Sequence, residues 1–134
     1  MESQANSQQT KPVEPKVNEL IAECKSLILA TVDADGNPTS SYAPFARSGN
    51  KFFILVSYMA RHTKNLKEVG KVSAMFIEDE SATKQIYARH RLTLDVSTRE
   101  IERETAEWTE AAEALQAVHG KILNAGFHYD RIND

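Results

Sequence analysis

The chain has 134 residues, the size of one domain, with 41% hydrophobic residues, 26% charged residues and a formal net charge of −3. This charge argues against a general nucleic-acid-binding protein, which usually carries a strong basic excess. The single cysteine, Cys24, allows no disulfide within the chain. Together with the lack of a recognisable signal peptide, it leads us to expect a cytoplasmic protein. The longest apolar run, Phe52–Val56, is too short to cross a membrane.

The N-terminal part of the sequence divides into a tail and a helix. Residues 1–12 are polar and predict a disordered tail, whereas residues 13–134 predict one folded domain. Val17, Leu20, Ile21 and Cys24 follow at helical spacing, which predicts a short helix from about residue 14 to residue 25. Cys24 is then most simply a small core residue.

Strand patterns dominate the middle of the sequence. A hairpin turn at Asp33–Pro38, in which Gly36 supplies the positive φ, separates the first two strands. A second turn at Arg47–Lys51 precedes the third. The predicted strands are Ser26–Val32, which is apolar on both faces, Thr39–Ala46 and Phe52–Ser57.

The next segments continue the β pattern. Tyr58–Val69 predicts a loop that enters a short helix, closed by Gly70. Strands are predicted at Lys71–Ile77 and Thr83–Val96, and the acidic run Glu78–Ser81 between them reads as a solvated turn.

The C-terminal part predicts a helix and a last strand. Ser97–Glu100 has the spacing of a capping box, and the helix after it ends at Gly120. Its expected apolar stripe comprises Ile101, Trp108, Ala111, Leu115 and Val118. Phe127–Ile132 predicts the last strand. The short turns favour antiparallel pairing, so the predicted fold class is mainly β, a small β-barrel with flanking helices.

The segment Ser57–Asn65 is the strongest candidate for a binding site. A strand ends at Ser57 and a helix begins a few residues later, with Arg61, His62, Thr63 and Lys64 between or near them. Helix N-termini and basic side chains bind anions, so a phosphate or carboxylate site is one interpretation. An ordinary solvated basic loop is the other.

The segment Lys84–Arg91 is a second candidate. As a strand it would place Gln85, Tyr87, Arg89 and Arg91 on one face, a polar row with an aromatic that suits a heteroaromatic ring. An exposed strand face without a ligand is the alternative.

The four histidines and the acidic residues give no further motif. His62, His90, His119 and His128 lack the close spacing of zinc ligands, and no CxxC is present. Any of them could bind haem iron, although a lone histidine is more often structural. No catalytic triad or nucleophile elbow is present, so the catalytic residues stay unknown.

Four segments together resemble a known family. They are SLILATVDADGNPTSSYAPFA, FFILVSYMARHTKNL, KVSAMFIEDES and KQIYARHRLTLDV. In this order they resemble the FMN-binding split β-barrel superfamily that contains pyridoxamine 5'-phosphate oxidase. ARHTKNL and IEDES…KQIYARHRLT are similar, within it, to haem-utilisation proteins of the HugZ/HutZ type. The resemblance covers about residues 14–132.

The resemblance implies a homodimer with two cofactor sites at the subunit interface. It implies haem as cofactor and oxidative haem degradation for iron acquisition, so the chain is expected to be an oxidoreductase. An FMN-dependent oxidoreductase and a non-catalytic haem carrier are the alternatives. The cofactor-binding residues it implies are Ser57, Arg61, His62, Thr63, Lys64, Gln85, Arg91 and Asp130, with His62 a weak candidate near the haem iron.

The resemblance also implies an absence. The family closes its barrel with a further strand after the segment that matches FHYDRI, and the axial histidine lies in the tail that follows. Because the sequence ends at Asp134, we expect this chain to lack that strand and that ligand.

Overall fold

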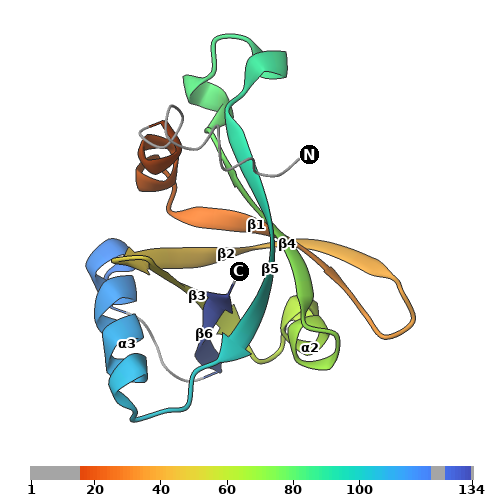
Figure 1. Ribbon diagram of the computed structural model, residues 1–134, viewed down its shortest axis with the longest axis vertical. Coiled ribbons are helices and arrows are strands. Elements are labelled where there is room, and N and C mark those ends of the chain that lie inside the picture. Colours follow the sequence, from red (N-terminus) through yellow and green to blue (C-terminus); the bar gives the residue numbers. More distant parts are fainter. Residues whose placement is uncertain (1–15, 122–125, 134) are drawn as a thin grey trace.

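The computed structural model describes residues 16–121 and 126–133, so the tail predicted for residues 1–12 lies outside the described residues. Within them, antiparallel strands form a closed barrel in the order β1-β2-β3-β6-β5-β4, which confirms the predicted fold class (Figure 1). The described part of the predicted N-terminal helix spans residues 16–23. The strands are β1 (Ser26–Val32), β2 (Pro38–Ser48), β3 (Lys51–Ser57), β4 (Lys71–Ile77), β5 (Arg91–Glu100) and β6 (Phe127–Asn133).

The barrel interior is filled by alternate residues of each strand. In β1 the side chains of Leu27 and Leu29 are buried, whereas those of Ile28 and Ala30 are exposed on the outer face. Phe45 and Phe76 meet edge to face inside the barrel, with ring centroids 5.0 Å apart. The apolar outer face predicted for β1 is therefore present, but in this single chain nothing among the described residues buries it.

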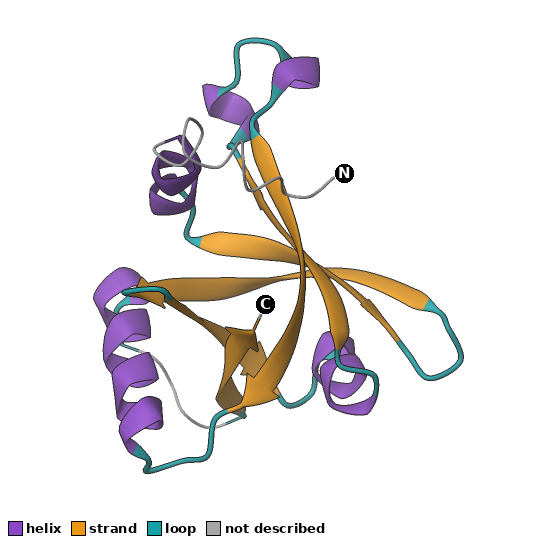
Figure 2. Cartoon of the chain, in the orientation of Figure 1, coloured by secondary structure: helices purple, strands orange, loops and turns teal. Residues whose placement is uncertain are grey.

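Two helices cover different parts of the barrel (Figure 2). α3 (Ala106–His119) packs mainly against β2, β3 and β6, and α2 (Arg61–Glu68) mainly against β1 and β2. A second core lies under α3, where Leu115 and Ala111 meet Phe53 and Tyr129. Neither of these two helices covers the outer face of β4 and β5. Among the described residues, no helix is both long and apolar enough to span a membrane.

The C-terminal strand closes the barrel. β6 pairs with β3 on one side and with β5 on the other. The resemblance had implied that a further strand performs this closure, but the barrel is already closed by β6. Alternate residues of β6 face opposite sides: Tyr129 packs under α3, whereas Ile132 packs against the barrel core.

The long strand predicted at Thr83–Val96 is confirmed only from Arg91 onward, and its first part is wrong. β5 begins only at Arg91, opposite Ile77 of β4, and residues 78–90 form an arm that projects from the barrel and contains the short helices η1 (Glu80–Ala82) and η2 (Ile86–Ala88) (Figure 1). The Thr83 hydroxyl donates to Oε1 of Glu78 at 3.0 Å. Such local side-chain bonds compete with strand pairing, so the face predicted for Lys84–Arg91 does not form.

The capping box predicted at Ser97–Glu100 is also wrong. These residues continue β5, where Ser97 pairs with Lys71 and with Asn133. The N-cap of α3 is Thr105, whose hydroxyl accepts a hydrogen bond from the amide of Trp108 at 3.2 Å. Ile101 was predicted on the apolar stripe of this helix, but it precedes the helix. Its side chain is buried as expected, with 2% exposed.

Candidate functional site

A groove opens where the barrel splits. The ladder between β2 and β3 joins only Phe45–Ser48 to Lys51–Ile54. Before Phe45, β2 pairs with β1, and after Ile54, β3 pairs with β6, so the two strands separate. A groove of about 620 Å³ lies in this gap, which is within the usual size range of small-molecule sites.

The groove has apolar walls and a polar end. Tyr42 and Pro44 of β2 face it from one side, and Leu55 of β3 and Phe127 of β6 from the other. Hydroxyl groups and the start of α2 complete the lining, which includes Thr39, Ser40, Ser41, Ser57, Ala60, Arg61 and His62. A flat ring could lie between the apolar walls while its charged edge reaches the polar end.

The N-terminus of α2 suits an anion. Its N-cap residue, Ala60, has no side chain that could bond the free amides, and the first turn holds no acidic residue. Arg61 is exposed there, and none of the described residues forms an ion pair with it. Unpaired amides and a positive dipole end attract negative charge, so this end of the groove supports the predicted anion site.

His62 lies at the floor of the groove, where it is 8% exposed. Its Nδ1 shares a hydrogen bond of 2.7 Å with the Ser41 hydroxyl, and its Nε2 has no partner among the described residues. Burial lowers the pKa of His62, while the Asp130 carboxylate opposes that shift and His128 adds to it. Burial therefore favours the neutral form of the His62 ring at the base of the site.

Asp130 lies inside the barrel, behind this floor. It is 4% exposed and does not line the groove. Its Oδ1 lies 3.0 Å from Nε2 of His128, and the ring of His128 packs against Tyr58 at a centroid distance of 4.6 Å. The predicted residues His62 and Asp130 thus belong to one buried polar cluster with His128, a residue that no sequence pattern placed there.

Thr63 and Lys64 differ from Arg61 in their surroundings. Thr63 is buried, and its hydroxyl donates to the carbonyl oxygen of Ser57, so it is engaged within the protein. Lys64 is exposed and near Asp33, whose pKa it helps to lower, after the larger effect of hydrogen bonds from Asn37. Neither residue lines the groove.

Gln85 and Arg91 lie at the end of the barrel that is opposite α2. Gln85 is on the arm and exposed, and Arg91 begins β5 opposite Ile77. β4 runs from beside α2 to the arm, and its seven residues span roughly 20 Å. Within one chain, therefore, Gln85 and Arg91 do not join the cluster around Arg61 (Figure 1).

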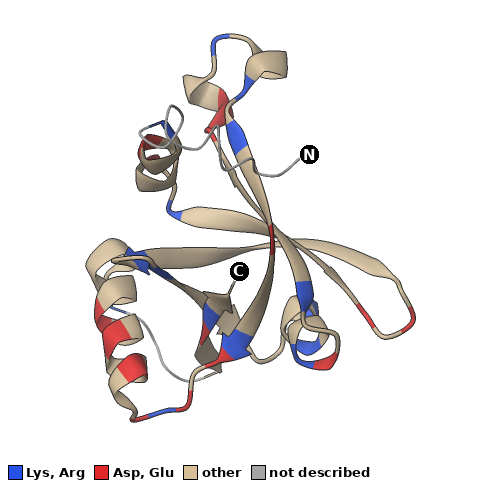
Figure 3. Ribbon diagram, viewed as in Figure 1, with Lys and Arg blue, Asp and Glu red and all other residues tan. Residues whose placement is uncertain are grey.

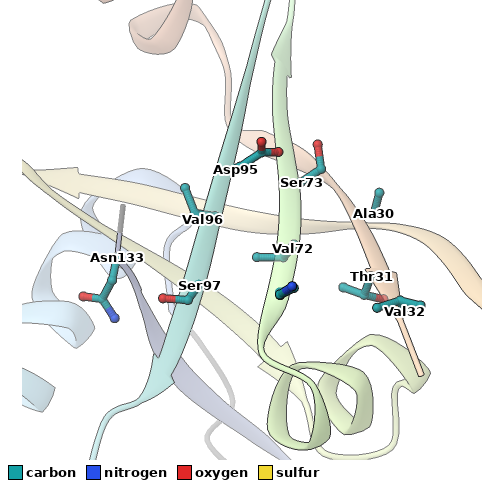
Figure 4. A pocket seen from close by; sticks show the side chains of 10 residues that line it. Ala30, Thr31, Val32, Val72, Ser73, Asp95, Val96, Ser97 and Asn133 are labelled. Atoms are coloured by element: carbon teal, nitrogen blue, oxygen red, sulfur yellow. The ribbon is translucent and has the colours of Figure 1, made fainter. Parts of the chain in front are cut away.

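A second hollow, of about 700 Å³, lies on the uncovered outer face. It contains none of the predicted residues. Figure 4 shows Ala30, Ser73 and Asp95 side by side on β1, β4 and β5, the row that the strand register also gives. No group of three or more possible metal ligands occurs among the described residues.

Sequence reasoning missed the apolar walls. Tyr42, Pro44, Leu55 and Phe127 come from three strands, and their proximity depends on where β2 and β3 separate. Strand alternation could have identified Tyr42 and Pro44 as lying on one face of a strand. It could not have shown that this face borders a groove.

Relatives of the chain support this description. Residues 13–131 match the model of the family described as "Pyridoxamine 5'-phosphate oxidase". The chain is 42% identical over 112 residues to "Heme oxygenase HutZ" of Vibrio cholerae, a match that covers 84% of this chain and 64% of that relative. The chain thus spans somewhat less than two thirds of that relative's length.

Solved structures agree with the sequence comparison. A crystal structure of HutZ from Vibrio cholerae, described as a heme storage protein, matches with a TM-score of 0.84 and 39% identity over 90% of this chain and 89% of that chain. ChuZ of Campylobacter jejuni matches with a TM-score of 0.82 and 26% identity over 98% of this chain and 55% of that chain. The chain therefore belongs to the pyridoxamine 5'-phosphate oxidase family of split barrels and, within it, is of the HutZ type.

Proposed function

We propose that this protein binds haem in the groove between β2 and β3 and serves in haem utilisation. The observation that supports this most directly is the groove itself, with apolar walls at Tyr42 and Leu55 and Arg61 beside an uncapped helix N-terminus. Haem combines an apolar macrocycle with two anionic propionates. The lining fits both parts, because the walls suit the ring and Arg61 suits a propionate.

The fit does not extend to an iron ligand. His62 lines the groove, and its Nε2 has no partner among the described residues, but this atom is buried. We therefore assign the residues around Arg61 to the ring and its carboxylates, and assign no residue to the iron.

The relatives support haem rather than FMN. One is named a heme oxygenase and a structure of HutZ is described as a heme storage protein. We propose oxidative haem breakdown as the activity. Bound haem would supply the redox chemistry, while the protein binds and orients it and excludes water. The lone, half-buried Cys24 is consistent with a cytoplasmic site of action.

We further propose a homodimer. Gln85 and Arg91 lie far from Arg61 in one chain, so they can share a cofactor with it only across two chains. The uncovered outer face offers an interface: Tyr42, Ile28, Met75 and Thr93 form a continuous row across β2, β1, β4 and β5. Exposed apolar side chains, such as those of Tyr42 and Ile28 in this row, are typical of subunit contacts.

Absorption titrations with haem and with FMN test the ligand. Binding of haem with a shifted Soret band is expected, and a protein that binds FMN and ignores haem would favour the flavin alternative. Incubation of the haem complex with a reductant and O2 then tests the activity. Loss of the Soret band with release of iron supports breakdown, whereas unchanged haem supports storage.

A matched pair of variants tests the site. Arg61→Ala removes the cation that lines the groove, whereas Lys64→Ala removes one that faces the β1–β2 hairpin. A charge-assisted hydrogen bond contributes about 1.5–3 kcal/mol, so Arg61→Ala should weaken haem binding roughly tenfold or more. Lys64→Ala should have a smaller effect. Equal, small effects would place the propionates elsewhere.

A further inference from the structure

His62 lies between the groove and the interior of the barrel. Its side chain lines the groove floor and is more than nine-tenths buried. Nδ1 lies 2.7 Å from the Ser41 hydroxyl, whereas Nε2 is buried and has no partner among the described residues. Behind the ring, the buried carboxylate of Asp130 acts on it electrostatically. A titratable ring therefore separates a buried negative charge from the groove.

Opposing influences act on the protonation of this ring. Burial lowers the pKa of His62 most, and the neighbouring His128 adds to that effect, while the Asp130 carboxylate favours the charged ring. The Ser41 hydroxyl can donate to a neutral ring or accept from a charged one, so this hydrogen bond is compatible with both forms. A second negative charge near the ring would shift the balance toward the charged form.

The anionic end of the groove is next to His62. Arg61 and the N-terminus of α2 lie there, and Arg61 lines the same groove as His62. Basic residues outnumber acidic ones on α2, whereas α3 carries glutamates and neither Lys nor Arg (Figure 3). An anion held at this end is therefore close to the His62 ring, where burial leaves little water to screen the two charges.

We propose that His62 takes up a proton from solvent when the groove binds an anionic ligand, and that it thereby selects ligands with a free carboxylate or phosphate. This inference rests on the proposed function and names the residue by which the site recognises the charge of the ligand. The proton is added to the imidazole, and the anionic group of the ligand stays ionised. The step is therefore a protonation, and no oxidant or reductant takes part.

Other charged or titratable groups surround His62. β6 contributes His128 and Asp130, which both act on it. The strand β1 contributes none, and β2 contributes Tyr42. The remaining groups on α2, in the residues before it and in the β1–β2 hairpin are Tyr58, Arg61, Lys64, Lys67, Glu68, Asp33 and Asp35. Since histidines titrate near neutral pH, His128 is the alternative acceptor of the proton.

Calorimetric titrations measure the uptake of the proton. The full chain is titrated near pH 7 with haem and with metal-free protoporphyrin IX, which has the same propionates and no iron, in buffers of different ionisation enthalpy. The dependence of the heat on the buffer gives the number of protons taken up, which should approach about one per ligand. Protoporphyrin IX dimethyl ester, which lacks the negative charges, should bind without uptake.

The affinity should depend on pH in one direction. Because the bound anion raises the pKa of His62, the added affinity is complete below the pKa of the free protein and is lost as the pH rises through that of the complex. Between these two values the affinity should fall by up to about tenfold per pH unit. An affinity that rises with pH in this range would contradict the proposal.

Single variants identify the histidine. His62→Gln keeps a polar group near Ser41 but does not titrate, so it should bind porphyrin without proton uptake. His128→Gln changes the other buried histidine and should keep the uptake, and His90→Gln, at a side chain that is 74% exposed, should match the wild type. Uptake that persists in His62→Gln overturns the assignment. Ring NMR signals of His62 in the wild type, with and without metal-free porphyrin, test the same protonation without a variant.

The outcomes separate this inference from the proposed function. A wild type that binds haem with the same heat in every buffer overturns the proton uptake and leaves haem binding intact. A wild type that ignores haem but binds FMN with an uptake that His62→Gln loses supports the proton uptake and removes haem as the ligand. A chain that binds neither haem nor FMN overturns both.

Discussion

At the scale of single residues, the buried cluster behind the groove is the feature with the clearest chemical consequence. His62 hydrogen-bonds to Ser41, while His128 and Asp130 are in contact with each other inside the barrel. All three titratable side chains are less than 10% exposed. A proton added to His62 would therefore be poorly solvated, although Asp130 would partly compensate it.

The buried surroundings of His62 make the stability of the folded protein depend on pH. Burial lowers the pKa of His62 below the ordinary histidine value of about 6.5, so the unfolded chain binds the proton more readily than the folded one. The stability contributed by neutral His62 is complete above that value and is lost as the pH falls below it. Thermal unfolding from about pH 8 to about pH 5 should show this fall in the wild type.

His62→Gln should reduce that pH dependence, since an amide keeps a polar group near Ser41 but does not titrate. His90→Gln is the control, because the His90 side chain is 74% exposed. If His90→Gln flattens the profile as much as His62→Gln does, the cluster behind the groove does not cause it.

At the scale of elements, α3 is attached to the barrel through its first turns. Glu107 lies between Arg99 of β5 and Arg131 of β6, at 2.8 Å and 3.1 Å. These hydrogen bonds lower the pKa of Glu107 to about 2, and the bond from Arg99 has the largest effect. Together with the apolar contacts of Leu115, they hold the helix over β3 and β6 and so support one wall of the groove.

The ion pairs of Glu107 with Arg99 and Arg131 predict that the stability of the protein falls in acid. Because the folded pKa of Glu107 is depressed, its contribution to stability is present above the ordinary glutamate value and is lost as the pH falls toward 2. Glu107→Gln should remove this part of the acid-induced loss in denaturant titrations at decreasing pH. Glu113→Gln changes an exposed glutamate of the same helix and should leave the loss as in the wild type.

The start of α3 gives a second prediction for this element. Thr105→Ala removes the hydroxyl that bonds the Trp108 amide, and such caps contribute about 1 kcal/mol. Thr105→Ser should restore most of the stability in urea unfolding. Ser97→Ala changes the position where the sequence suggested a cap, and it should lower the free energy of unfolding much less. A larger loss for Ser97→Ala would contradict the cap at Thr105.

At the scale of the whole molecule, the outer face of the barrel is the surface through which we propose that two chains associate. Ile28 is 37% exposed at the centre of the row formed with Tyr42 and Met75. Ile28→Lys should dissociate the proposed dimer, because a two-fold contact places the new charge near its own copy. Light scattering will measure the mass, with Val118→Lys on α3 as the control. A dimeric Ile28→Lys variant would exclude this face.

The secondary structure of the two candidate segments was predicted with different success, for a physical reason. Ser57–Asn65 combines a strand end with a helix start, and both signals are local, so its arrangement followed from neighbouring residues. The structure places Ser57, Arg61 and His62 along one groove. The alternating pattern of Lys84–Arg91 predicts a strand. Hydrogen bonds to Glu78 instead fold this part of the chain into an arm, and an alternating pattern carries no information about such bonds.

The sequence by itself determined the mainly β class, the strands Ser26–Val32 and Lys71–Ile77, and the basic start of α2, because periodicity, turn residues and capping act over a few positions. The tertiary structure decided what surrounds that basic segment. Barrel closure separates β2 from β3 and opens the groove, buries His62, His128 and Asp130 together, and places Gln85 at the opposite end. These features depend on contacts between residues distant in the chain, which local patterns do not specify.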